Sequence, residues 1–269
     1  MSPMLFICLC MVKDMAEDLK ELRKEIDSVD TELVVQLKKR FDITSRIGKY
    51  KAGTGMELFC PEREAEKLES LRKALGDYAY SEYIVRLFGD IMDYSKLQQS
   101  RDIFGTEDVF LIGMPGCGKS VIGSEIARKT YREFIDMDAL FSNRYGITPA
   151  SMIEKNGEDE FRDKETELLR FIVKNRKDSE KGRVISCGGG IVVRDVNREF
   201  LTLDSIVIYI KRNIDELSRK GRPLSSSVGV QKLYEQRAGK YESWSSFIIE
   251  NDGSLSDAID KIMKKLARC

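Results

Sequence analysis

The chain has 269 residues, which is enough for one large domain or two ordinary ones. Its 45 basic and 45 acidic residues balance, so no basic field indicates a nucleic-acid partner. The sequence contains no histidine, which excludes Ser-His-Asp catalysis, Cys-His catalysis and every histidine metal site.

Residues 4–12 form a short apolar run that has no basic flank and is too short to span a bilayer. We expect residues 1–16 to be a disordered leader and Met15 to be the true start, with a signal peptide as the alternative. No later segment predicts a membrane span. The six cysteines include no Cys-x-x-Cys pair. We expect them to be reduced thiols in a cytoplasmic protein.

A helical segment comes next. Apolar residues recur every three or four positions from Glu17 to Lys51, and no proline or glycine precedes Gly48 in this stretch. The pattern predicts one long amphipathic helix. Two more helices are expected, one from Pro61 and one over about 81–97. A hairpin of helices cannot cover so long an apolar stripe, so we expect a second copy of the chain to pack on it.

The first helix carries three cations whose spacing is informative. Arg40 and Lys51 lie about three helical turns apart and so share a face. Arg23 and Lys51 would lie about 40 Å apart along the same helix, too far for one small ligand to contact both. A second protomer running antiparallel would bring its own Arg23 to the site. From periodicity alone, the alternative is a dimerising helical hairpin with an ordinary charged surface.

The pattern changes after about residue 101. Short apolar runs then alternate with helical stretches, which predicts an α/β domain with a central parallel sheet. The runs are Val109–Ile112, Arg183–Ser186, Ser205–Ile210 and Phe247–Ile249. We therefore expect an all-α domain over 17–101, a linker over 102–106 and an α/β domain over 107–269.

A glycine-rich loop follows the first of these runs and precedes a helical stretch, which is the context of a phosphate-binding loop. Its backbone N–H groups and the helix N-terminus would attract phosphate oxygens, Lys119 would reach the outer phosphates, and Ser120 would hold Mg²⁺. ATP and Mg²⁺ are the expected cofactors, and a chance glycine turn is the alternative. The glycines of the loop are Gly113, Gly116 and Gly118.

Several further candidates follow the loop. Alternation at the end of a strand predicts that Asp136 and Asp138 point the same way. Taken singly, each candidate has an ordinary explanation: a helix cap, a flexible turn or a solvated arginine. The other candidates are Arg162, Gly188–Gly190, Arg222 and Arg237.

The order and spacing of these groups resemble shikimate kinase over about residues 107–269. The resemblance implies ATP- and Mg²⁺-dependent phosphorylation of shikimate to shikimate 3-phosphate. It assigns Lys119 to the transferring phosphoryl group, and Ser120, with Asp136 through water, to Mg²⁺. Phosphoryl transfer needs mainly positioning and charge neutralisation, which these groups supply. The alternative is a P-loop kinase for another small polyol acid.

On the substrate side, the resemblance places Asp138 at the acceptor hydroxyl and makes Arg222 a lid arginine that closes on the phosphates. Arg162 and Arg237 would grip the shikimate carboxylate through paired donors. The glycines along the shikimate ring would be Gly189 and Gly190.

The first segment resembles the all-helical chorismate mutase family over about residues 17–101, on motifs such as Leu22-Arg23-Lys-Glu-Ile26, Gly48-Lys-Tyr-Lys51 and Pro61-Glu-Arg63-Glu64. Rearrangement of chorismate to prephenate is pericyclic and needs no cofactor, and Lys51 with Gln99 would stabilise charge on the ether oxygen. Cys60 stands where the family usually has an aspartate. The resemblance implies a pocket lined by Arg23 of the other subunit, Arg40, Lys51, Arg63, Glu64, Ser95 and Gln99.

The sequence therefore predicts a bifunctional cytoplasmic enzyme of aromatic amino acid biosynthesis, a chorismate mutase followed by a shikimate kinase. We expect a homodimer through the helical domain. The expected partners are the small molecules shikimate, ATP and chorismate, with neither nucleic acid nor membrane. For the first half, the alternative is a non-catalytic regulatory or dimerisation module.

Overall fold

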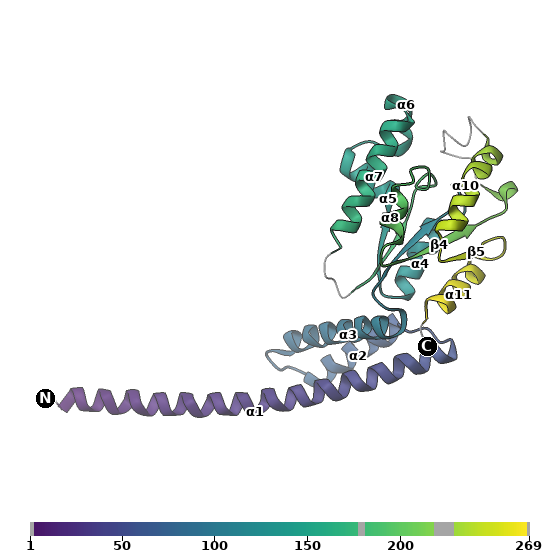
Figure 1. Cartoon of the computed structure of the whole chain (residues 1–269). Coiled ribbons are helices and arrows are strands. Elements are labelled where there is room, and N and C mark those ends of the chain that lie inside the picture. The colour runs from purple at the N-terminus through teal and green to yellow at the C-terminus, as the bar shows by residue number, and fades with distance from the viewer. Residues whose placement is uncertain (1–2, 177–180, 218–228, 268–269) are drawn as a thin grey trace. The chain divides into compact units, whose positions relative to one another are not determined.

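The computed structural model describes residues 3–176, 181–217 and 229–267, with the side chains described from residue 18 onward. Two compact units make up the chain, Met1–Ile47 and Gly48–Cys269. Figure 1 shows the order of the helices and strands along the chain. None of the described helices is long and apolar enough to cross a membrane.

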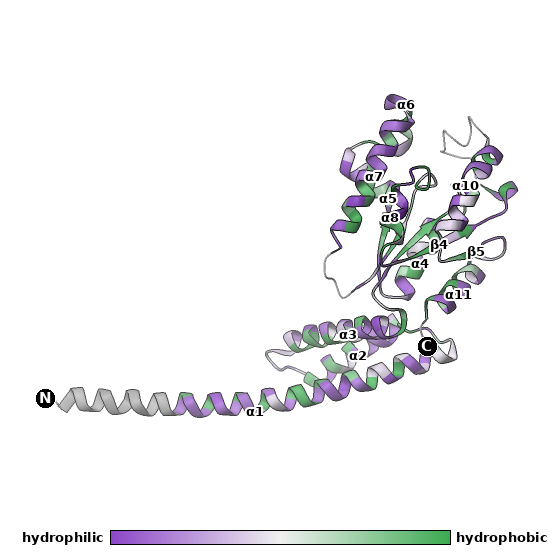
Figure 2. Ribbon diagram, viewed as in Figure 1, coloured by the Kyte–Doolittle hydropathy of each residue, from purple (hydrophilic) through white to green (hydrophobic). Residues whose placement is uncertain are grey.

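A single helix, α1 (Pro3–Thr54), supplies most of the first unit and continues into the second. The sequence predicts a disordered leader before Glu17, whereas the helix begins at Pro3, because no proline or glycine interrupts residues 4–47. Its hydrophobic residues recur along the helix between polar ones, as Figure 2 shows. The apolar side chains are exposed: Leu22 is 60% exposed and Ile26 is 59% exposed.

Two shorter helices follow in the second unit, α2 (Pro61–Leu75) and α3 (Ser81–Phe104), and they pack against each other. Pro61 occupies the first turn of α2, where its missing N–H costs nothing. The sequence predicts the end of α3 near residue 97, but the helix runs on to Phe104. The added turns are held by burial, since Ile103 and Phe104 belong to the apolar cluster that also contains the central strands.

The predicted parallel sheet is confirmed. Its five strands lie in the order β2-β3-β1-β4-β5, and every neighbouring pair runs parallel. All residues of β1 are buried, as expected for a central strand covered on both faces. The strands are β1 (Asp108–Ile112), β2 (Glu133–Asp136), β3 (Arg183–Ser186), β4 (Ser205–Lys211) and β5 (Phe247–Glu250).

Helices connect these strands and supply the remaining core. Because the strands are parallel, the segments that leave β1, β2 and β3 start from the same edge of the sheet, where ligands bind in folds of this kind. The described helices are α4 (Lys119–Lys129), α5 (Met137–Tyr145), α6 (Pro149–Asn156), α7 (Glu158–Lys174), α8 (Asn197–Thr202), η1 (Ile214–Glu216), α10 (Val230–Trp244) and α11 (Leu255–Leu266).

Candidate active sites

The glycine loop lies between β1 and α4, as its sequence context predicts. Gly113, Gly116 and Gly118 all have positive φ, a conformation that glycine adopts without strain and that lets the loop turn tightly. At Gly113 the glycine is also required by space, because a Cβ there would lie 2.4 Å from the carbonyl oxygen of Ile210.

Lys119, the first residue of α4, is buried beneath this loop. Its Nζ donates hydrogen bonds to the carbonyl oxygens of Gly113 at 2.9 Å and Met114 at 3.0 Å. The ammonium group is therefore held under the loop by two uncharged carbonyl acceptors. A phosphate oxygen, which carries a full charge, would compete with these carbonyls for the same donor.

The next residue, Ser120, joins two strand ends. Its Oγ donates to Oδ2 of Asp136 at 2.6 Å and lies 3.2 Å from Oγ of Ser186, the last residue of β3. The two predicted metal-binding side chains are thus in direct contact. Their oxygen atoms are of the type that Mg²⁺ prefers, with phosphate and water completing such sites.

Asp136 and Asp138 lie near each other for a different reason from the predicted one. Asp136 ends β2 and caps α5, and its Oδ1 accepts from the backbone N–H of Asp138 at 3.0 Å. Asp138 is therefore in the first helical turn, and strand alternation does not apply to it. Both residues line a cavity of about 290 Å³ together with Lys119 and Ser120.

Arg162 lies on α7 and is only 3% exposed. Its guanidinium donates to Oε2 of Glu165 at 2.7 Å and to Oε1 of Glu158 at 2.9 Å. Burial raises the pKa of the Glu165 carboxyl above its usual value, and the charge of Arg162 opposes that shift. The sequence analysis missed Glu165, because its burial depends on packing that the spacing of α7 does not reveal.

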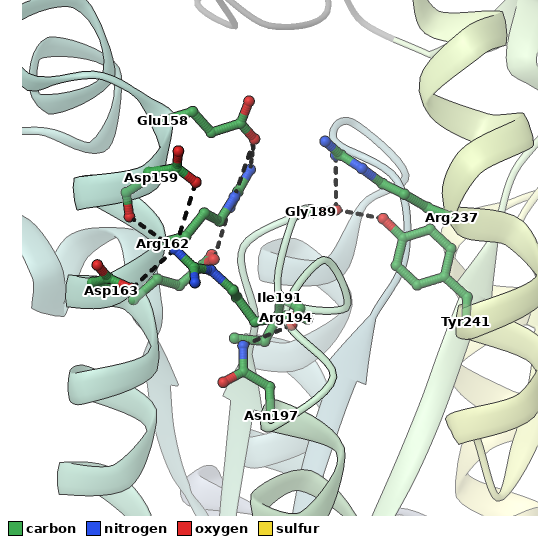
Figure 3. A network of polar contacts seen from close by, with 11 residues as sticks. Glu158, Asp159, Arg162, Asp163, Gly189, Ile191, Arg194, Asn197, Arg237 and Tyr241 are labelled. Atoms are coloured by element: carbon green, nitrogen blue, oxygen red, sulfur yellow. Dashed lines mark hydrogen bonds and ion pairs between the residues drawn. The ribbon is translucent and has the colours of Figure 1, made fainter.

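Arg237 lies on α10 and reaches the glycine loop that follows β3. Its guanidinium donates to the carbonyl oxygen of Gly189 at 3.1 Å, and the hydroxyl of Tyr241 donates to the same oxygen. Figure 3 shows Arg162 and Arg237 approaching from α7 and α10, with the loop that carries Gly189 between them. A Cβ at Gly190 would lie 2.1 Å from the guanidinium nitrogens of Arg162, so glycine is needed there.

The two predicted carboxylate-binding arginines line one cavity of about 510 Å³. Three more cations line it, Arg194, Lys232 and Lys240, which the sequence analysis missed. Arg194 pairs with Asp163 of α7 at 2.9 Å, and Lys240 pairs with Asp195 at 2.7 Å. These two ion pairs connect the segment that follows the glycines after β3 to α7 and to α10. The predicted lid residue Arg222 lies outside the described residues.

Among the predicted mutase residues, Lys51, Ser95 and Gln99 come from the second unit. Nζ of Lys51 donates to the carbonyl oxygen of Leu58 at 3.0 Å. Gln99 and Ser95 are buried on α3. A Cβ at Gly48 would lie 2.9 Å from Cγ of Gln99, so the helix turn before Lys51 packs closely on Gln99.

Arg63 and Glu64 lie in the first turn of α2, where Cys60 is the N-cap. The cysteine makes no capping hydrogen bond, and its Sγ instead lies 3.4 Å from Oε2 of Glu62. Oε2 of Glu64 pairs with Nζ of Lys96 at 2.8 Å. The sequence analysis did not select Lys96, although it is the neighbour of Ser95.

Arg23 and Arg40 belong to the first unit, and the Arg23 side chain is exposed. The structure places Arg23 and Lys51 on one continuous helix, as predicted. An ideal straight helix would separate the two residues by about 40 Å along its axis. The expectation that a second copy of the chain supplies Arg23 stays a prediction.

Comparison with known proteins identifies both halves. A family model of shikimate kinase matches residues 115–267, and a model of chorismate mutase type II matches residues 22–100. A shikimate kinase of Clostridium botulinum (strain Alaska E43 / Type E3) is 36% identical over 162 residues, which cover 58% of this chain and 94% of that protein.

Solved structures agree with this assignment. Shikimate kinase from Acinetobacter baumannii in complex with shikimate is 28% identical, with a TM-score of 0.56, over 62% of this chain and 96% of that one. Shikimate kinase from Aquifex aeolicus vf5 is 26% identical, with a TM-score of 0.50, over 59% of this chain and 95% of that one. The predicted pair of families, in the predicted order, is confirmed, and the kinase family implies the use of ATP. The chain belongs to the shikimate kinase family, and a chorismate mutase type II domain precedes its kinase domain.

Proposed function

We propose that the kinase domain transfers the terminal phosphoryl group of ATP to a hydroxyl of shikimate at the edge of the sheet. The observation that carries this proposal is the placement of two sets of groups around one glycine loop. Lys119, Ser120 and Asp136 lie in one cavity, and the paired arginines line another. Gly189 lines the first cavity and is held by Arg237 of the second.

In this proposal the phosphate loop binds the ATP phosphates, and Lys119 exchanges its two carbonyl acceptors for phosphate oxygens. Mg²⁺, held by Ser120 and through water by Asp136, would neutralise charge on the phosphates. Asp138 orients the acceptor hydroxyl or takes its proton. Arg162 and Arg237 bind the carboxylate of the acceptor, and Arg222 closes over the phosphates.

For the helical domain we propose rearrangement of chorismate to prephenate. The supporting observation is the close packing of Gly48 on Gln99, which brings the end of α1 that carries Lys51 beside α3. Lys51 and Gln99 would stabilise the charge that develops on the ether oxygen as its bond to the ring breaks. Arg40, Arg63, Glu64 and Ser95 would hold the folded substrate.

A homodimer completes this site in our proposal. Apolar residues along α1 are exposed, including Val29 and Leu33, and a second copy of the same helix would cover them. That copy would also supply Arg23, which its own chain cannot bring to Lys51. We propose domain limits of 17–101 and 107–269 and a cytoplasmic location.

The alternative for the first half is a regulatory or dimerising module without catalysis. One observation favours it: Cys60 provides neither a cap for α2 nor the carboxylate that the family usually has there.

One experiment tests both activities. Purified chain is assayed for loss of chorismate, and separately for ATP-dependent consumption of shikimate, with and without EDTA. Chelation should abolish phosphorylation and leave prephenate formation intact, because the mutase groups are all organic. Loss of both activities with EDTA contradicts the two-site proposal, and absence of chorismate turnover leaves the non-catalytic alternative.

A further inference from the structure

Residues 128–132, the last two residues of α4 and the turn that leads to β2, form a kinase-domain segment that contacts the mutase domain. We call this segment the α4–β2 turn. Nζ of Lys129 pairs with Oε1 of Glu57 at 2.8 Å. The hydroxyl of Ser100, on α3, donates to the carbonyl oxygen of Thr130 at 2.5 Å. All of these residues belong to the compact unit Gly48–Cys269.

Arg132 fastens this turn to the end of α3. Its guanidinium donates to the carbonyl oxygens of Phe104 at 2.8 Å, Gly105 at 3.2 Å and Glu107 at 2.5 Å. Arg132 is 5% exposed, so these bonds are shielded from water and correspondingly strong. The last turn of α3 and the α4–β2 turn therefore form one fixed corner.

Tyr131 projects from this corner toward the mutase domain. Its φ is 53°, a left-handed conformation that a tyrosine adopts only where its surroundings hold it there. The ring lies 5.5 Å from the ring of Phe59, and Nζ of Lys96 lies 5.1 Å from its centroid. Burial, and after it a hydrogen bond with the Asp93 carboxylate, raise the pKa of the Tyr131 hydroxyl.

Lys96 connects Tyr131 to the mutase pocket. Its ammonium group pairs with Oδ1 of Asp93 at 2.7 Å and with Oε2 of Glu64 at 2.8 Å. The side chains of Lys96 and Glu64 are 18% and 30% exposed, which makes this pair less screened than an ordinary surface pair. Lys96 also follows Ser95 directly and lies one turn before Gln99, so its position is tied to that of two pocket residues.

We propose that Tyr131, although it belongs to the kinase domain, is a positioning residue for the mutase site. Its ring and its hydroxyl hold Lys96 and Asp93, and Lys96 in turn holds the Glu64 carboxylate where chorismate binds. The inference rests on the proposed mutase function of the helical domain. It implies that the mutase domain depends on a residue outside the length of chain that its own family model covers.

The test replaces Tyr131 with leucine, which keeps an apolar side chain but removes the π face and the hydroxyl. Mutase kcat/KM should fall about tenfold, mainly through KM, because Glu64 binds the substrate and does not act on the ether oxygen. Shikimate kinase activity should stay within about twofold, and it also reports that the domain carrying the substitution is folded. Tyr78→Leu is the matched control, since Tyr78 is 53% exposed in the α2–α3 connection and should change neither activity.

A double-mutant cycle separates positioning from general damage. In a Lys96→Met background, Tyr131→Leu should have almost no further effect on mutase KM, because the group through which it acts is gone. Lys96→Arg should retain most of the activity by keeping the pairs with Glu64 and Asp93. Tyr131→Phe, which keeps the ring, gives a milder second variant and should fall between leucine and wild type.

Hydrogen exchange of the peptide around residues 60–66 gives a readout that needs no mutase turnover. Exchange should be faster in Tyr131→Leu than in wild type or Tyr78→Leu. Unchanged mutase KM and unchanged exchange, or effects of Tyr131 and Lys96 that simply add, overturn the inference. A wild-type chain that never turns over chorismate overturns the proposed mutase function and this role together. If the wild-type chain is an active mutase and Tyr131→Leu leaves that activity unchanged, only the positioning role of Tyr131 is overturned.

Discussion

The hydroxyl of Ser120 donates a 2.6 Å hydrogen bond to the carboxylate of Asp136, and this bond joins the start of α4 to the end of β2. The two residues are far apart in sequence but adjacent in space, because β3 is the neighbour of both β1 and β2. In the proposed mechanism this contact marks the place where the metal-bound phosphates meet the acceptor side of the site.

Lys119→Ala should lower the kcat for shikimate phosphorylation by about 100- to 1000-fold, because it removes a fixed positive charge from the transferring group. Mutase activity should not change. A steady-state assay with saturating ATP and shikimate measures the effect. A loss of less than about fivefold would show that Lys119 does not contact the reacting phosphate.

Arg162→Ala and Arg237→Ala should both raise the KM for shikimate far more than the KM for ATP. They should differ in stability, because removal of Arg162 leaves the Glu165 carboxylate buried without its partner. Breaking such a pair costs about 3 kcal/mol, whereas Arg237 leaves behind a carbonyl that Tyr241 still contacts. Thermal unfolding of the two variants measures the difference.

The Arg162→Ala deficit should also depend on pH. Burial already raises the pKa of Glu165, and loss of the arginine removes the main opposing charge. A group whose pKa is raised on folding stabilises the folded state at low pH and loses that contribution as the pH rises. The difference in unfolding free energy between wild type and variant should therefore shrink as the pH is lowered from about 8 to about 5.5. A deficit that is constant over this range would contradict the assignment to Glu165.

Cys60→Asp should stabilise the protein by about 1 kcal/mol, since the cysteine makes no capping bond at α2 and aspartate is among the best N-cap residues. The mutase rate should be maintained or raised. Denaturant unfolding and chorismate turnover are measured on the same preparation, with Cys60→Ala as the control that lacks a cap. A clear fall in mutase rate would mean that residue 60 is not equivalent to the family's aspartate.

Mixed dimers test the second-copy proposal. Arg23→Ala and Lys51→Ala homodimers should each be nearly inactive as mutases. Unfolding and reassembling an equal mixture should restore about one quarter of wild-type mutase activity, because half of the random dimers contain one intact site of two. Kinase activity should stay constant throughout. No recovery, once exchange of subunits has been demonstrated by mass, would place the site within one chain.

The sequence was most informative where function depends on local order. Strand, glycine turn and helix follow one another around Lys119, so the phosphate loop can be predicted from a few consecutive residues. The prediction that strand alternation points Asp136 and Asp138 the same way used a wrong premise, although both residues line one cavity. Asp136 caps the next helix, and strand alternation gives no information about a residue that is already helical.

Other features depend on long-range packing and were missed. The end of α3 was predicted near residue 97, because the residues that follow Leu97 are mostly polar. In the structure Ser100 and Phe104 are buried, and tertiary contacts carry the helix on. Tyr131 offered no signal either, since a left-handed tyrosine in a turn cannot be distinguished by composition from any surface tyrosine.

Ile103 and Phe104 sit in the same apolar cluster as the strands of the kinase sheet. Two side chains of this size, fully buried, contribute about 3–6 kcal/mol together. At this corner the two domains are therefore joined by the packing of buried side chains as well as by the continuous backbone. If the two domains were expressed as separate polypeptides cut within 105–107, each would expose apolar surface that is buried in the intact chain. The helical domain would expose the end of α3, and the kinase domain would expose the side chains that pack against it.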